Sequence, residues 1–178
     1  MKSYDYAHRA GVLPISWEEY ASLADRLAEA IAGSGPDLIV GIARAGLFPA
    51  TSVAAALRRE LYPVRITRRV NDEVVHERPV WRVPVPREVA GQRVTVIDEI
   101  ADTGETLRLV AEEVRRLGAS HVVTATLAVH SWADPMPDVT ALVSDALIMW
   151  PWDRRVYTDG RWVENPELTS ALQAQNPD

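Results

Sequence analysis

The chain has 178 residues, 47% hydrophobic and 25% charged, so it is long enough for one globular core and short for two. It has no cysteine, which excludes disulfides, zinc-thiolate sites and thiol nucleophiles, and its formal charge of −6 argues against a broad nucleic-acid-binding face. No run approaches the ~18 consecutive apolar residues of a membrane span, and the first residues lack the apolar core of a signal peptide. We therefore expect a single soluble, cytoplasmic domain that binds neither nucleic acid nor membrane.

Alternating strand and helix patterns fill most of the chain. The first helix begins at a capping box, Ser16 to Glu19, and stays amphipathic until Gly33. Strand, helix, strand, helix in this order predicts an α/β fold, in which a mainly parallel sheet carries helices on both faces. The predicted strands cover residues 37–42, 63–69, 92–98 and 121–130, and the predicted helices cover residues 16–32, 49–61 and 105–117.

Smaller parts are predicted around this core, which spans about residues 16–130. Residues 70–86 contain short β-rich runs broken by prolines, which indicates a hairpin or a mobile flap. A proline-rich loop and two short apolar strands then form a small hood over about residues 131–165. The polar tail from about Asn165 is predicted to be frayed.

Two loops carry most of the chemical information. Residues 43–46 read Ala-Arg-Ala-Gly, and residues 98–106 read Asp-Glu-Ile-Ala-Asp-Thr-Gly-Glu-Thr. Each follows a buried strand and precedes a helix. Because ligands of parallel sheets bind outside the carboxyl ends of the strands, we expect both loops to lie at that edge and to build one site.

The second loop has two chemically different halves. From Thr103 to Thr106, backbone N–H groups, hydroxyls and the start of a helix converge, as in a phosphate cradle. Asp98 and Glu99 repel phosphate, but carboxylates accept hydrogen bonds from sugar hydroxyls and ligate Mg²⁺. A sugar phosphate bound with a metal fits both halves. The alternative is a polar strand-to-helix turn with a capping Asp or Thr.

The segment VIDEIADTGET, from Val96 to Thr106, resembles the phosphoribosyl pyrophosphate (PRPP) signature of type I phosphoribosyltransferases. The resemblance implies that Asp98 and Glu99 hold the ribose hydroxyls and the metal, and that Asp102 lies beside the incoming base and takes part in its proton transfer. It also implies a grip on the 5′-phosphate by four consecutive residues: Thr103, Gly104, Glu105 and Thr106.

The first loop resembles the pyrophosphate loop of the xanthine-guanine and hypoxanthine branch of that family. The resemblance implies that Arg44 contacts pyrophosphate, a task that suits the forked guanidinium. Ala45 stands where that branch has a glycine, at a place where the family's loop often holds a non-proline cis peptide. Arg68 and Arg69 would help to bind pyrophosphate when the flap closes; the alternative is a solvated strand end.

The segment WPWD, from Trp150 to Asp153, resembles the motif that closes the family's base-binding hood. The resemblance implies that Asp153 helps to hold the metal through water and that the main chain near Ile148 reads the purine edge. Two positions depart from the pattern. His130 stands where a lysine binds the 6-oxo group, and Leu147 stands where an aromatic ring stacks on the base. His130 has the alternative of being a satisfied strand-end residue.

The implied reaction is Mg²⁺-dependent transfer of the phosphoribosyl group from PRPP to a nucleobase, in the first place a 6-oxopurine, by a homodimer or homotetramer. Other enzyme interpretations fail on spacing. Leu47 stands where a Walker lysine would be, and a single Asp-Thr-Gly followed by a helix does not make an aspartic protease. Two alternatives stay open: a PRPP sensor of the same fold without transferase activity, and a transferase for a non-standard acceptor.

Overall fold

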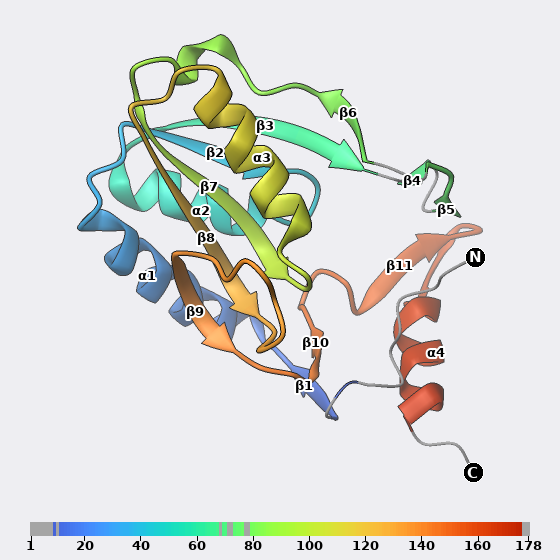
Figure 1. Ribbon diagram of the computed structural model, residues 1–178. Coiled ribbons are helices and arrows are strands. Elements are labelled where there is room, and N and C mark those ends of the chain that lie inside the picture. Colours follow the sequence, from blue (N-terminus) through green and yellow to red (C-terminus); the bar gives the residue numbers. More distant parts are fainter. Residues whose placement is uncertain (1–8, 10, 68, 71–72, 77–78, 176–178) are drawn as a thin grey trace. The chain divides into compact units, whose positions relative to one another are not determined.

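The computed structural model describes residues 9, 11–67, 69–70, 73–76 and 79–175 (Figure 1). Contacts divide the chain into two compact units. The sheet unit is Leu23–Val143, and the terminal unit combines Met1–Ser22 with Ser144–Asp178. Each unit has its own strands and is described by itself.

The sheet unit is built on a six-stranded sheet with the order β6-β3-β2-β7-β8-β9. Five strands run parallel, and β6 joins the edge antiparallel to β3. The prediction of a mainly parallel sheet is confirmed. The strands are β2 (Leu38–Ile42), β3 (Glu60–Thr67), β6 (Val80–Val83), β7 (Arg93–Ala101), β8 (His121–Val129) and β9 (Val139–Val143).

Helices α2 (Leu47–Leu57) and α3 (Glu105–Arg116) cover opposite faces of this sheet (Figure 1). On one face, a Cβ added to Gly41 would lie 2.7 Å from the Cβ of Ala50, so α2 packs directly on the backbone of β2. On the other face, valines of the central strands and the apolar side of α3 form one buried cluster. That cluster includes Val40, Val94, Val96, Leu107, Val110 and Val114. The prediction of helices on both faces is confirmed.

Helix α2 ends earlier than predicted. Arg58 adopts a left-handed conformation, with φ of 56°, and its N–H caps carbonyl groups of the last turn. The chain then enters β3 at Glu60. The prediction of helix through residue 61 was therefore wrong, because helix-forming residues after Arg58 pair with β2 instead.

The predicted flap consists of two different structures. Strands β4 (Arg69–Val70) and β5 (Glu73–Val74) form a short antiparallel hairpin. Strand β6 instead pairs with β3, with Trp81 opposite Ile66, so this part of residues 70–86 is an edge strand of the main sheet and not a separate flap. A 3₁₀ turn, Arg87–Val89, leads from β6 toward β7. Arg68 lies outside the described residues, and for Arg69 only the backbone is described.

The terminal unit contains the start of α1 (Trp17–Ala32), and the predicted capping box is confirmed there. The N–H of Glu19 donates to Oγ of Ser16 at 3.1 Å, and the N–H of Ser16 donates to Oε2 of Glu19 at 2.7 Å. The helix continues into the sheet unit, where Leu27 and Ile31 are fully buried. In the terminal unit itself, Tyr20 packs edge-on against Trp152.

Two small sheets complete the terminal unit. Strand β1 (Val12–Pro14) runs parallel to β10 (Leu147–Met149), and β11 (Arg155–Thr158) pairs antiparallel with β12 (Arg161–Glu164). Asp159 and Gly160 form the turn of this hairpin, and both have positive φ. An Asp-Gly pair between two β-rich runs is a strong hairpin signal, which the sequence interpretation did not use.

The C-terminal tail is a helix, α4 (Pro166–Gln175), so the prediction of a frayed tail was wrong. The side-chain amide of Asn165 donates to the carbonyl of Asp153 at 2.8 Å, and the carbonyl of Asn165 accepts from the N–H of Thr169. Ala171 is fully buried. An Asn followed by a Pro in the first turn is a helix-start signal, and the burial of Ala171 supplies the tertiary contact that a polar sequence did not reveal.

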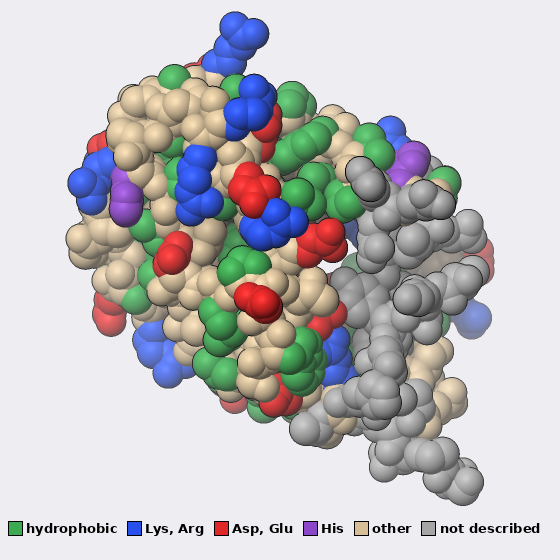
Figure 2. All heavy atoms as spheres, viewed as in Figure 1, with side chains coloured by type: hydrophobic (Ala, Val, Ile, Leu, Met, Phe, Trp, Pro, Cys, Tyr) green, Lys and Arg blue, Asp and Glu red, His purple; other side chains and the backbone are tan. Residues whose placement is uncertain are grey.

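Acidic and basic side chains are intermixed on the face that Figure 2 shows. On α3 they form pairs one turn apart: Arg108 bonds Glu112, and Arg116 bonds Glu113, each at 2.6 Å. Such pairs stabilise an exposed helix by a few tenths of a kcal/mol, roughly 0.2–0.5 each. Among the helices of the described ranges, none is long and apolar enough to cross a membrane.

Candidate active site

The two predicted loops meet at the carboxyl edge of the sheet. A Cβ added to Gly46 would lie 2.6 Å from Oδ1 of Asp98, and 2.5 Å from the carbonyl oxygen of Ile42. Separations this short do not occur for real side chains, so only glycine allows the 43–46 loop to approach the acid pair. The close approach places the predicted pyrophosphate loop against the predicted ribose and metal ligands. Asp98 lies within β7 and not at its end: the prediction that this strand ends at residue 98 was wrong, because Ile100 and Ala101 still pair with β8.

The backbone of the first loop is fixed from both sides. The peptide bond between Ala43 and Arg44 is cis, as the resemblance implied for this loop. The N–H of Ala43 donates to the carbonyl of Val64 at 2.7 Å, which ties the loop to β3. On the helix side, the carbonyls of Arg44 and Ala45 accept from the first turn of α2. The side chain of Arg44 is exposed, so its guanidinium is accessible to a phosphate ligand.

The acid pair is strained electrostatically. Asp98 is only 9% exposed, and its Oδ1 accepts the backbone N–H of Glu99 at 2.9 Å. Burial, and secondly repulsion by the carboxylate of Glu99, raise the pKa of Asp98 well above its ordinary value. A divalent cation would relieve that repulsion.

Asp98 and Glu99 fit a magnesium ion held jointly with substrate. Within the described ranges, no cluster of three or more His, Asp or Glu side chains forms a protein cage for a metal. Mg²⁺ usually binds through one or two carboxylates together with phosphate oxygens and water. Two adjacent carboxylates at the edge of a phosphate site match that pattern.

The predicted phosphate side of the second loop is the N-terminus of α3. Gly104 has a left-handed φ of 82°, and its carbonyl accepts the N–H of Arg108 as the helix begins. Thr103 and Glu105 are exposed, Thr106 is half-buried, and the first N–H groups of a helix lack intrahelical acceptors. This is the arrangement that binds an anion at a helix start.

The segment after β8 packs on this phosphate loop. A Cβ added to Gly104 would lie 2.4 Å from the carbonyl oxygen of Pro135, so the two backbones touch at the glycine. The N–H of Asp134 donates to the carbonyl of Thr103 at 3.1 Å. The sequence interpretation treated this segment as a plain proline-rich loop, whereas the structure makes it part of the site.

Asp102 is joined to His130 through a residue that the sequence interpretation missed. The indole Nε1–H of Trp132 donates to Oδ1 of Asp102 at 3.2 Å. The ring of Trp132 stacks on the ring of His130, with centroids 4.5 Å apart and planes 13° from parallel. His130 is 2% exposed, whereas Trp132 is 46% exposed. The local sequence gives no signal for this contact, because it joins residues 30 positions apart.

The terminal unit contains three of the predicted site residues: Leu147, Ile148 and Asp153. They are not among the site residues that the sheet unit brings together. The N–H of Leu147 donates to the carbonyl of Gly11, and the carbonyl of Met149 accepts from Ile15. Since successive residues of a strand direct their polar groups to opposite sides, the N–H and C=O of Ile148 point away from β1. The β1–β10 pairing therefore does not use these two main-chain groups.

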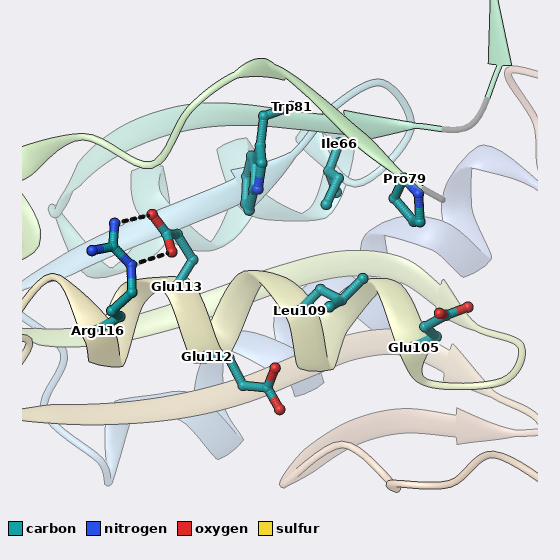
Figure 3. Close-up of a pocket in the computed structure, with 8 residues that line it drawn as sticks. All are labelled: Ile66, Pro79, Trp81, Glu105, Leu109, Glu112, Glu113 and Arg116. Carbon is teal, nitrogen blue, oxygen red and sulfur yellow. Dashed lines mark hydrogen bonds and ion pairs between the residues drawn. The ribbon is translucent and has the colours of Figure 1, made fainter. Parts of the chain in front are cut away.

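A groove of about 470 Å³ lies elsewhere in the sheet unit, between β6 and α3 (Figure 3). Its apolar walls come from Ile66, Pro79, Trp81 and Leu109. Among the predicted site residues whose side chains the structure describes, only Glu105 lines it. We therefore place the candidate site at the loops and not in this groove.

The family profile of the phosphoribosyl transferase domain matches residues 15–157. The chain belongs to the phosphoribosyltransferase family, the class of enzyme that the acid pair and the phosphate loop indicated.

Individual proteins with purine phosphoribosyltransferase names are similar to most of this chain. The chain is 31% identical to the xanthine-guanine phosphoribosyltransferase of Nitratidesulfovibrio vulgaris over 148 residues, which cover 82% of this chain and 86% of that protein. It is 29% identical to the protein of the same name from Cereibacter sphaeroides over 147 residues, 78% of this chain and 85% of that one. The crystal structure of a purine phosphoribosyltransferase from Pyrococcus horikoshii superposes with a TM-score of 0.73 at 29% identity, covering 84% of this chain and 99% of that one.

Proposed function

We propose that this phosphoribosyltransferase transfers the 5-phosphoribosyl group from PRPP to a 6-oxopurine, namely hypoxanthine, guanine or xanthine, and releases pyrophosphate. The observation that carries the proposal is the contact between Gly46 and Asp98, which sets an arginine-bearing loop beside an acid pair and a helix start. One substrate that needs all three is a pyrophosphorylated ribose 5-phosphate. The xanthine-guanine relatives support the choice of a 6-oxopurine.

In the proposed reaction, a purine nitrogen attacks the anomeric carbon of PRPP while the bond to pyrophosphate breaks. Arg44 binds the leaving pyrophosphate, Asp98 and Glu99 hold the ribose hydroxyls, and residues 103–106 grip the 5′-phosphate. The bound Mg²⁺ would supply positive charge for the departing pyrophosphate, held by Asp98, Glu99 and, through water, Asp153. The transition state has oxocarbenium character, so neutralising the leaving group and orienting the base matter more than a strong protein nucleophile.

Base recognition in this proposal uses the side-chain and main-chain groups that the resemblance implies. Asp102 accepts the proton that the base nitrogen loses. His130 donates to the 6-oxo group, the main chain at Ile148 reads the purine edge, and Leu147 contacts the ring face. His130 carries no obligatory positive charge, unlike the lysine that the family pattern has at this position, so we expect discrimination among the three bases to differ from that of family members with the lysine.

The test is a product assay with purified protein, Mg²⁺ and PRPP, in which hypoxanthine, guanine, xanthine, adenine, uracil and orotate are supplied separately. Formation of the 5′-monophosphate and pyrophosphate from a 6-oxopurine is the expected result. PRPP binding without product from any base would instead indicate a sensor of this fold or an acceptor outside the set. We also expect a cytoplasmic homodimer or homotetramer, which light scattering on the purified protein can check for its oligomeric state.

A further inference from the structure

Three consecutive residues of the second loop each accept a hydrogen bond from one short segment, residues 130–134. The N–H of His130 donates to the carbonyl of Ala101 at 3.2 Å, and the N–H of Asp134 donates to the carbonyl of Thr103 at 3.1 Å. Between them, the indole N–H of Trp132 donates to the carboxylate of Asp102. The segment therefore holds Asp102 from its side chain and from the backbone on both sides.

The segment itself is anchored beyond Trp132. Oδ2 of Asp138 accepts from both the N–H and the hydroxyl of Thr124, each at 2.8 Å, and the N–H of Asp138 donates to the same hydroxyl at 3.0 Å. The carbonyl of Pro135 presses against Gly104. Because both ends are fixed to the sheet unit, the indole of Trp132 has a defined place and is not a loosely held surface side chain.

The position of Trp132 is unusual for a residue that serves only packing. Nearly half of it is exposed, one face of its ring lies on His130, and its polar edge meets Asp102. An indole N–H can only donate, so it leaves Asp102 an acceptor and restricts the rotation of the carboxylate. The same ring holds the imidazole of His130 flat beneath it.

We propose that Trp132 is a positioning residue for base transfer: it fixes the carboxylate of Asp102 and the ring of His130 relative to each other, so that both meet the same edge of the purine. This inference rests on the proposed function, in which Asp102 and His130 contact the base. It assigns to an unrecognised tryptophan the task of setting the spacing between the proton acceptor and the group that recognises the 6-oxo oxygen.

The variant Trp132→Phe keeps an aromatic ring on His130 and removes the N–H donor. We expect turnover at saturating base to fall about tenfold, the lower end of the cost of a hydrogen bond to a charged group, and KM for PRPP to change less than about twofold. Trp132→His, which restores an N–H on an aromatic ring, should recover part of the loss. The matched control is Trp162→Phe, at an exposed tryptophan of the β11–β12 hairpin.

A double-mutant cycle identifies the route of the effect. If Trp132 acts through Asp102, adding Trp132→Phe to Asp102→Asn should change turnover far less than it does in the wild-type background. If the wild type is active and Trp132→Phe has no larger effect than Trp162→Phe, this inference is overturned while the proposed function stands. A full tenfold loss in the Asp102→Asn background, or no gain in Trp132→His over Trp132→Phe, would have the same meaning. No product from the wild type with any base would overturn the proposed function and this inference together.

Discussion

The proposed phosphate side and the proposed base side of the candidate site are built in different ways. On the phosphate side, short loops approach each other so closely that Gly46 admits no side chain, and the chemistry comes from backbone N–H groups and adjacent acids. On the base side, Asp102, Trp132 and His130 are side chains from two separate loops, connected by one hydrogen bond and one ring stack. Backbone geometry constrains sequence to a short motif, whereas side-chain contacts between distant segments leave no local pattern. Variation in base preference is therefore expected on the second side.

The largest effect should follow from Asp102→Asn, which tests whether the base side carries the proton transfer. The amide cannot accept a proton, so kcat should fall by ~10²- to 10⁴-fold, the usual contribution of general base catalysis. Affinity for PRPP, measured by calorimetry in the presence of Mg²⁺, should stay within about twofold. If PRPP affinity fell as much as kcat, Asp102 would serve PRPP binding as well as the base, and the division into two sides would fail.

Arg44→Ala should act on the phosphate side. Removal of the guanidinium eliminates charge-assisted hydrogen bonds to pyrophosphate. The loss of such a bond costs roughly 1.5–3 kcal/mol, which corresponds to about a 10- to 100-fold weaker binding of PRPP. The ranking of bases by kcat/KM should not change. Arg59→Ala, at an exposed arginine beyond the other end of α2, is the control. A changed ranking of bases in Arg44→Ala would contradict the division of the site into a phosphate side and a base side.

Gly46→Ala should show how the course of the 43–46 loop affects the phosphate side while the charge of Arg44 is kept. The added Cβ would meet Asp98 and the carbonyl of Ile42, so the loop must shift, at a cost of about 1–3 kcal/mol in unfolding free energy. PRPP binding should fall as well, because Arg44 shifts with the loop. Gly33→Ala is the matched control, since its Cβ would meet nothing within 4 Å. Chemical denaturation and calorimetry measure the two effects, and equal stability of both variants would contradict the close approach.

Asp98→Asn should give a smaller and pH-dependent effect on stability without ligand. Because burial and Glu99 raise the pKa of Asp98 in the folded protein, ionisation of Asp98 costs stability as the pH rises through that pKa. The Asn variant should therefore melt at a higher temperature than the wild type at pH 8, and the difference should vanish toward pH ~3.9, where an unfolded Asp is half protonated. Asp25→Asn, on the exposed side of α1, controls for loss of one charge. A lower melting temperature for Asp98→Asn at pH 8 would contradict this account.

The sequence predicted the parts whose information is local. The parallel sheet, the capping box at Ser16 and the loops at the ends of β2 and β7 follow from periodicity, capping residues and short motifs. The end of α2 was missed because Arg58 turns left-handed, a conformation that propensity does not indicate for arginine. Helix α4 was missed because its stability includes the burial of Ala171, a tertiary contact.

The candidate site divides in the same way. Asp98, Glu99 and the turn at Gly104 could be recognised from one stretch of sequence. Trp132 could not, because its contact with Asp102 joins residues 30 positions apart, and nothing in the local pattern distinguishes it from an exposed loop tryptophan. The contribution of β6 to the main sheet was hidden for a similar reason, since its pairing with β3 depends on register between separated segments.

The backbone contact between Gly104 and Pro135 has a consequence for recombining this enzyme with its relatives. Two loops that touch at a glycine cannot change length or course independently, because a shift in either one moves the other. In a chimaera that takes only the 130–135 loop from a relative, that loop would no longer fit the 101–104 loop that it contacts. Residues 101–104 and 130–135 should therefore be exchanged together, as a single interchangeable module, when base preference is transplanted between members of the family.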